Sequence, residues 1–301
     1  MYKSSNNVKA YLFLTLAALF WSGNFIVGKV ASFYNIPPFS LNFYRWFFAF
    51  LILLPFTYQE VINNKDYILK NKGLFIALGI TSITIFNSIV YYSLYYTQVI
   101  SGILMISTIP VWILFFASVL KIEKTNIFQI SGVILSLTGV LFIITKADIN
   151  LIKELEFNKG DLSMVIGMLS WAIYSALLRK KKHPISQLAT LEIIIICGFI
   201  FLIPIYFIEM SFGNKIVLGL PFILTLSYVV LFPGLFAFLF WIKGIDIIGA
   251  NRSGVFLHLM TIFGASMAII ILGEKFMFYH FLGAIFIIAG ITLSNKVKKN
   301  A

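Results

Sequence analysis

The sequence predicts an all-α integral membrane protein with ten transmembrane helices, arranged as two inverted five-helix repeats. Three observations lead to this prediction. Only 11% of the residues are charged, whereas a soluble domain carries about 25%. Charged and turn residues divide the chain into ten apolar stretches of about 20 residues, the length that crosses ~30 Å of hydrocarbon as a helix. The two halves of the chain also repeat one another in register.

The first five stretches lie between residues 8 and 145. The first ends near Lys29, and the second follows Pro37 and Pro38. No charged residue occurs between 73 and 120. That stretch is long enough for two crossings, which we expect to join near 96–98. The predicted spans of this half are 8–31, 39–58, 73–92, 99–120 and 125–145.

The other five stretches are bounded by charged residues from Asp161 to Lys296. All ten spans are expected to be helices, because lipid offers the backbone amide groups no outside partner. Strands of a β-barrel would alternate polar and apolar residues, and the run LEIIIICGFIFLIP does not. The predicted spans of this half are 162–178, 187–208, 221–242, 247–272 and 276–295.

The net charge of +12 is explained by membrane topology, so nucleic acid is not expected as a partner. If the N-terminus lies in the cytoplasm, the segments on that side carry fifteen of the lysines and arginines. They are Lys3, Lys9, Lys65, Lys70, Lys72, Lys121, Lys124, Arg179, Lys180, Lys181, Lys182, Lys243, Lys296, Lys298 and Lys299. The outer segments carry five, namely Lys146, Lys153, Lys159, Lys215 and Lys275. The excess predicts a cell (inner) membrane protein with both termini cytoplasmic.

The repeat is visible without gaps. At an offset of 151 residues, Glu123 aligns with Glu274, Gly132 with Gly283 and Gly139 with Gly290. At an offset of 150, Trp21 aligns with Trp171 and Lys29 with Arg179. We therefore expect one five-helix repeat in 1–148 and a second in 149–301. Five is an odd number, so the second repeat enters the membrane upside down, as in secondary transporters that work by alternating access.

Several segments resemble the EamA-type branch of the drug/metabolite transporter superfamily. They are ALFWSGNFIVGKV, LNFYRW, LKIEK, LGEK, GANRSGVFLHLMTIFGA and FLGAIFIIAGI, and the resemblance extends over nearly the whole chain. Thr261 departs from it, because it aligns with Pro110 where the family often has proline in both halves. The resemblance implies a ten-helix carrier of small metabolites, often amino acids, with a central cavity and export favoured.

Ionisable residues inside spans are functional candidates by default, because they are costly to insert. Lys29 and Arg45 are placed in the outer half of the membrane by the charge count. Lys29 could line an outer vestibule, pair structurally or reach the interface. Arg45 could clamp a substrate carboxylate through two hydrogen bonds or tie helix ends together. Glu192 and Arg252 lie on the inner side, where they could pair with each other. Alternatively, Glu192 could bind a proton or cation.

Polar and aromatic residues inside the spans are candidates for a substrate cavity. Asn251 and His258 belong to a stripe along one face of the ninth span, where His258 is either a packing residue or a ligand. The other candidates are Trp21, Asn24, Asn87, Tyr91 and Trp112. Rings and amides of this kind suit a zwitterion with an apolar or aromatic side chain, or an organic cation. Simple packing is the alternative for each ring.

Several functions are disfavoured by missing motifs. The P-loop motif GxxxxGK[ST] is absent, so ATP-driven transport is not expected. The three histidines are scattered and Cys197 is the single cysteine, so we expect no metal, no cofactor and no enzyme activity. The leading hypothesis is a carrier of small organic metabolites. A sugar-phosphate or nucleotide-sugar antiporter is the alternative, followed by an intramembrane enzyme and by a channel or lipid scaffold. The glycine pairs suit helix packing or a homodimer.

Overall fold

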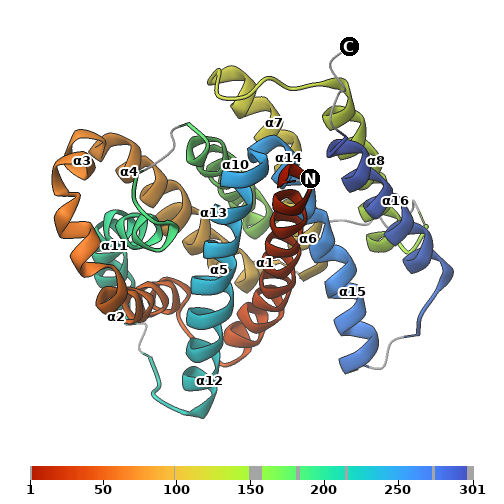
Figure 1. The fold of residues 1–301 in the computed structure, drawn as a ribbon. Coiled ribbons are helices and arrows are strands. Elements are labelled where there is room, and N and C mark those ends of the chain that lie inside the picture. The colour runs from red at the N-terminus through yellow and green to blue at the C-terminus, as the bar shows by residue number, and fades with distance from the viewer. Residues whose placement is uncertain are drawn as a thin grey trace.

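The fold is described by a computed structural model (Figure 1). It covers residues 2–97, 99–148, 158–180, 184–213, 216–272 and 275–296. Every element in these residues is helical. The elements of the first half are α1 (Tyr2–Phe33), α2 (Pro38–Asn63), α3 (Lys65–Lys70), α4 (Lys72–Gly79), η1 (Ile80–Phe86), α5 (Asn87–Tyr96), α6 (Val99–Ile106), α7 (Ile109–Val119) and α8 (Ile127–Ile144).

The second half is also a series of helices, interrupted by the π-helical segment η2 and the 3₁₀ segment η3. Its elements are α10 (Lys159–Leu178), α11 (Gln187–Ser211), α12 (Leu220–Val229), η2 (Val230–Phe236), α13 (Ala237–Ile248), α14 (Ala250–Gly254), η3 (Val255–His258), α15 (Leu259–Leu272) and α16 (Phe278–Ser294). The predicted boundary between the repeats at 148 and 149 adjoins residues 149–157, which lie outside the described part of the chain.

Eight helical stretches of the described residues are long and apolar enough to cross a membrane. They are Asn6–Phe33, Pro38–Asn63, Lys72–Tyr96, Ser101–Val119, Ile127–Ile144, Lys159–Leu178, Gln187–Ser211 and Leu220–Ile248. The ninth predicted span is divided among α14, η3 and α15. The tenth corresponds to α16, an apolar helix of 17 residues that is shorter than the others. The count of ten spans therefore stays a prediction.

Side-chain caps explain where several helices begin. The Asn126 side chain accepts a hydrogen bond from the backbone N–H of Gln129. The Gln129 side chain accepts one from the backbone N–H of Asn126, and both bonds are 3.0 Å long. Asn158 and Asp161 form the same reciprocal cap at the start of α10. The first amide groups of a helix have no intrahelical acceptor, so these caps fix the starts of α8 and α10.

Two π-helical segments occur at corresponding places in the two halves. The seven residues of η1 and those of η2 differ by 150 in number, the offset that relates Trp21 to Trp171. Pro233 lies inside η2 and cannot donate a backbone hydrogen bond. Asn87, the first residue of α5, donates a hydrogen bond from its side chain to the carbonyl of Ser82 in η1 at 2.6 Å. Segments of this kind often mark functional sites.

The last helices of the two halves, α8 and α16, lie side by side at one edge of the molecule (Figure 1). Their glycines meet crosswise. A Cβ atom at Gly132 would lie 2.6 Å from the carbonyl oxygen of Gly290, and one at Gly139 would lie 2.5 Å from that of Gly283. Small residues allow such close backbone approach. These glycines are thus used within the chain, and they no longer argue for a homodimer, which stays a prediction.

The core between the halves is aromatic. The rings of Trp21 and Trp171 meet edge to face, with centroids 5.1 Å apart and planes at 87°. Both rings also contact Phe238, at 5.9 and 5.2 Å. Edge-to-face contacts of this type are favoured by the ring quadrupoles. This cluster joins α1, α10 and α13 around the middle of the molecule and forms one wall of the site described next.

Candidate functional site

The central feature of the site is Arg45, a fully buried arginine on α2. Its Nη1 atom donates hydrogen bonds to Asn87 Oδ1 and to the Tyr91 hydroxyl, both at 2.8 Å. The guanidinium carbon lies 4.8 Å from the ring centroid of Trp46 and 6.0 Å from that of Phe238. These rings offer cation–π attraction and hold the guanidinium plane in place.

The hydrogen bonds continue into neighbouring helices. The Tyr91 hydroxyl donates to Asn24 Oδ1 on α1 at 2.9 Å, and Trp21 Nε1 donates to the carbonyl of Pro233 in η2 at 3.1 Å. The structure therefore brings five predicted candidates together from α1, α2 and α5. They are Trp21, Asn24, Arg45, Asn87 and Tyr91.

One edge of the Arg45 guanidinium carries no partner. Its Nε and Nη2 atoms are buried and form no hydrogen bond with any described residue. Among the described residues, the salt bridge that forms joins Arg179 to Glu123. Arg45 therefore has no acidic partner in that part of the chain. An isolated buried charge costs several kcal/mol. The N–H groups of Nε and Nη2 point the same way, which matches the two oxygens of a carboxylate.

A small cavity of about 20 Å³ adjoins this network at Asn24 and Asn87, whereas Arg45 and Tyr91 do not line it. That volume holds about one water molecule. The cavity is lined by both halves of the chain. Its lining residues are Trp21, Asn24, Phe25, Phe86, Asn87, Val90, Ile106, Ile109, Trp171, Leu257 and Met260. In this structure the cavity is too small for an organic molecule.

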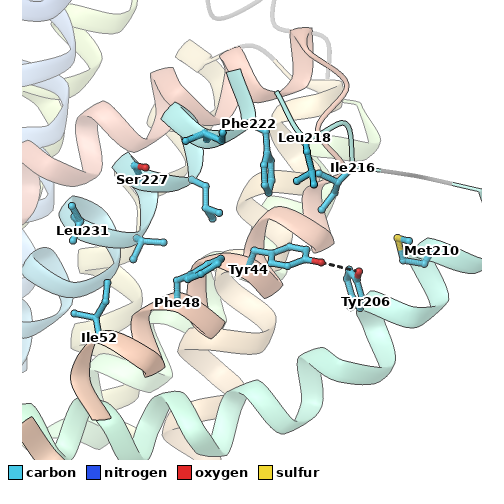
Figure 2. Close-up of a pocket in the computed structure, with 13 residues that line it drawn as sticks. Tyr44, Phe48, Ile52, Tyr206, Met210, Ile216, Leu218, Phe222, Ser227 and Leu231 are labelled. Carbon is cyan, nitrogen blue, oxygen red and sulfur yellow. Dashed lines mark hydrogen bonds between the residues drawn. The ribbon is translucent and has the colours of Figure 1, made fainter. Parts of the chain in front are cut away.

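A larger groove of about 830 Å³ lies between α2, α11 and α12 and is shown in Figure 2. Its lining is apolar apart from Ser227 and the Tyr44 and Tyr206 hydroxyl groups, which lie 3.2 Å apart. None of the predicted site residues lines this groove. Because Phe48 and Ile223 on its walls are 40% and 55% exposed, the groove opens at a helix surface that would meet lipid.

Lys29 and Arg179, which align in the two repeats, each donate hydrogen bonds to backbone carbonyl groups near the end of a helix. Lys29 Nζ donates to the carbonyl oxygens of Leu94 and Thr97 at 2.9 and 3.0 Å, at the end of α5. Arg179 Nη1 donates to the carbonyl of Asp246 at 2.8 Å, near the end of α13. Cations at C-terminal carbonyl groups stabilise a helix end. The structure thus gives Lys29 a helix-capping contact, and a role in an outer vestibule stays a prediction.

The predicted Glu192–Arg252 pair does not form. Arg252 Nε donates to Asn295 Oδ1 at 3.1 Å, and its Nη2 donates to the Tyr11 hydroxyl at 3.2 Å. Both carboxylate oxygens of Glu192 are buried and have no hydrogen-bond partner among the described residues. The pairing was wrong because α11 packs against α2, α4, η1 and α13, whereas Arg252 points from α14 toward α1 and α16.

The remaining three candidates lie outside the Arg45 network. His258 is fully buried, with Nε2 2.7 Å from the carbonyl oxygen of Ser107 and Nδ1 2.6 Å from Ser136 Oγ. The carbonyl accepts, so Nε2 carries the proton and the serine hydroxyl donates to Nδ1. Asn251 Nδ2 lies 3.4 Å from Thr125 Oγ1. Trp112 packs against Phe115, with centroids 6.1 Å apart. No contact links these three to substrate binding, so that role stays a prediction.

Sequence reasoning missed Gly234 as part of the site. A Cβ atom at this position would lie 3.4 Å from Arg45 Nε and 2.8 Å from the carbonyl oxygen of Val229. The glycine therefore leaves space beside the unpaired edge of the guanidinium. The signal in the sequence was the Pro233-Gly234 pair in the middle of an apolar span, because both residues disturb a helix.

Glu123 links the two halves at the end of the molecule where α14 begins. Its carboxylate accepts hydrogen bonds from the amide groups of Ala250 and Asn251 at 3.2 and 3.0 Å, and lies 3.2 Å from Arg179 Nε. A carboxylate at a helix N-terminus favours capping. Its repeat counterpart, Glu274, lies outside the described residues.

Replacing Glu123 with alanine is expected to lower stability by about 1–2 kcal/mol, because the cap of α14 and the ion pair are both lost. The measurement is the apparent Tm of the purified protein in detergent. Lys124→Ala is the matched control, since its exposed side chain should leave the Tm unchanged. An unchanged Tm in Glu123→Ala would show that the link between α14 and Arg179 does not stabilise the fold.

The chain matches known proteins along most of its length. The profile of the EamA-like transporter family matches residues 8–145 and again 158–296. An "Uncharacterized transporter" of Archaeoglobus fulgidus is 26% identical over 96% of this chain and 98% of its own. The "Uncharacterized transporter YyaM" of Bacillus subtilis is 24% identical over 97% and 95%. The "WAT1-related protein At3g18200" of Arabidopsis thaliana is 25% identical over 96% and 82%.

The fold also resembles a solved structure. One protein crystal structure superposes with a TM-score of 0.72 at 15% sequence identity, and the match covers 94% of this chain and 95% of that chain. At that level of identity the likeness concerns the fold alone.

Proposed function

Because the chain belongs to the EamA-like transporter family, we propose that it is a secondary carrier of small organic metabolites bearing a carboxylate, such as amino acids. It works by alternating access around the cavity beside Arg45, and export is the favoured direction. Its place is the cell membrane, with both termini in the cytoplasm. The transport cycle needs no covalent chemistry and no cofactor.

The unpaired edge of Arg45 is the observation that carries this proposal. A buried guanidinium with two free N–H groups offers a carboxylate a bidentate partner. The amide side chains of Asn24 and Asn87 lie in the same cavity lining as Trp21, Phe86 and Trp171. Amides and rings together suit a zwitterion with an apolar or aromatic side chain.

The sugar-phosphate or nucleotide-sugar alternative is less well supported. A phosphate ester carries about two negative charges and calls for several converging cations. Lys29 is bonded to helix-end carbonyl groups, and Arg252 is bonded to Asn295 and Tyr11. Arg45 is thus the single arginine or lysine placed in the network within the described residues, which favours a singly charged acidic group.

Several contacts support two inverted repeats of five spans. The family profile matches the chain twice. Ser107 and His258 correspond at an offset of 151 and are bonded to each other. Trp21 and Trp171 correspond at 150 and their rings are in contact. Contacts between a residue and its own counterpart are expected near a two-fold axis that relates the halves. In inverted-repeat carriers, the two repeats are related by such an axis, which lies in the membrane plane.

Counterflow in proteoliposomes tests the proposed function. Vesicles containing the protein are preloaded with unlabelled phenylalanine and diluted into radiolabelled phenylalanine. A carrier accumulates label transiently and saturates with concentration. The proposal fails if flux rises linearly without counterflow, as in a channel. It also fails if no standard amino acid is exchanged.

A further inference from the structure

Glu192 on α11 is a buried carboxyl group that the Arg45 site does not use. Its side chain is 1% exposed, and neither carboxylate oxygen has a hydrogen-bond partner in the described part of the chain. We propose that Glu192 is the proton-binding site that couples this carrier to a proton gradient. It is protonated in the closed structure, and it releases its proton when the cytoplasmic side of the carrier, where Glu192 lies, opens to water. This inference rests on the proposed transport function.

The hydrogen-bonding surroundings of Glu192 differ from those of a second buried carboxyl group on the same helix. Glu209 is 5% exposed, and its oxygens accept hydrogen bonds from the amide groups of Phe39 and Ser40 and from Ser40 Oγ, at 3.1, 2.6 and 2.6 Å. Donors at the start of α2 stabilise an ionised carboxylate there. Glu192 has no such donors, so the two acids on α11 are held in different ways.

The charged and titratable groups on the elements packed against α11 have other positions or partners. Arg45 is bonded to Asn87 and Tyr91, and Glu60 accepts from Ser186. The remaining groups on these elements are Tyr44, bonded to Tyr206; Tyr58, which is 56% exposed; Lys72, which is exposed; Lys243, over the Phe13 ring; and Asp246, near Gln187. The segment η1 carries no titratable side chain.

A proton fits this environment better than a metal cation. An ionised carboxylate without donors or a counter-ion in the protein interior costs several kcal/mol, and protonation removes the charge. A bound metal cation would need several oxygen ligands. The Glu192 oxygens have no polar partner in the residues that the structure describes. The neutral acid is therefore the form that the closed structure accommodates.

The proton site and the carboxylate site are separate. Residue 60 of α2 lies against 186, the N-cap of α11, and residue 40 lies against 209, so the helices run antiparallel. By interpolation Glu192 lies level with about residue 55 of α2, ~15 Å from Arg45 at 1.5 Å per residue. Proton and substrate therefore do not compete for one position. The two sites communicate through the packing of α11, which carries Glu192, against α2, which carries Arg45.

Infrared spectroscopy of the purified protein tests the protonated state without any substrate. We expect the wild type at neutral pH to show the C=O stretching band of a protonated carboxylic acid. The band should be lost in Glu192→Gln and retained in Glu209→Gln, the matched control on the same helix. A wild type without the band, or a band that persists in Glu192→Gln, would overturn the assignment. The substitution to Gln is close in shape to the neutral acid, so folded protein is expected.

Transport under a pH gradient tests the coupling. Wild-type proteoliposomes should accumulate radiolabelled phenylalanine more strongly with a gradient than without one, and Glu209→Gln should do the same. In Glu192→Gln the ratio of the two accumulations should fall to about one. A gradient response retained in Glu192→Gln would contradict coupling at this residue. If the wild type exchanges no standard amino acid, the proposed function fails, while the infrared result still decides whether Glu192 is protonated.

Discussion

Arg45→Ala is expected to abolish transport of carboxylate substrates while leaving folded protein at normal yield. The loss of a buried charged partner costs about 2–5 kcal/mol in binding, which is roughly 30-fold or more in affinity. Stability should change little. The substitution removes two hydrogen bonds to Asn87 and Tyr91, but it also removes an unpaired buried charge. The measurements are counterflow in proteoliposomes and the apparent Tm in detergent.

Two controls separate binding from folding in this experiment. Arg45→Lys keeps the charge but lacks the planar edge with two N–H groups, so it should restore only part of the affinity. Arg252→Lys changes an arginine that is bonded to Asn295 and Tyr11 and should leave substrate affinity unchanged. Normal transport by Arg45→Ala would show that this guanidinium does not hold the substrate.

Gly132→Leu is expected to destabilise the protein strongly, because the backbones of α8 and α16 are in contact at this position. A Cβ atom there would lie 2.5 Å from the Ser294 amide nitrogen and 2.6 Å from the Gly290 carbonyl oxygen. Backbone atoms cannot move aside as a flexible side chain can, so the helices must separate. Overpacking typically costs about 1–3 kcal/mol, and a leucine against backbone should reach or exceed the upper figure.

Fluorescence-detected size exclusion and the apparent Tm measure this effect. Gly290→Leu, on the other side of the same contact, should behave like Gly132→Leu. Gly73→Leu is the control, because a Cβ atom at Gly73 meets nothing within 4 Å. Gly132→Leu protein with the wild-type Tm would mean that α8 and α16 do not pack through these glycines.

Much of the arrangement follows from the sequence because lipid restricts the choices. The uncharged run from 73 to 120 predicts two spans, and the structure forms helices from Lys72 to Tyr96 and from Ser101 to Val119. The network of Asn24, Arg45 and Tyr91 joins residues that were predicted separately. Polar groups in apolar spans need hydrogen-bond partners within the protein, so polar side chains from different spans tend to form hydrogen bonds with each other.

Other features depend on information that a linear pattern does not contain. Glu192 and Arg252 were predicted on the same side of the membrane, but depth does not fix the direction in which each helix faces. The ninth predicted span tightens to a 3₁₀ segment at Val255–His258, although Thr261 stands where a proline would signal an irregular helix. The groove between α2, α11 and α12 also arises from packing between spans that are distant in sequence.

The opposite orientation of the two halves is the claim on which alternating access depends. Asp66 and Phe212 follow the second helix of their respective halves, and both are exposed. In a background of Cys197→Ser, single cysteines at these two positions are treated in intact cells with a membrane-impermeant maleimide. The account predicts labelling at position 212 and protection at position 66 until the cells are opened. Labelling of both positions from the same side would contradict it.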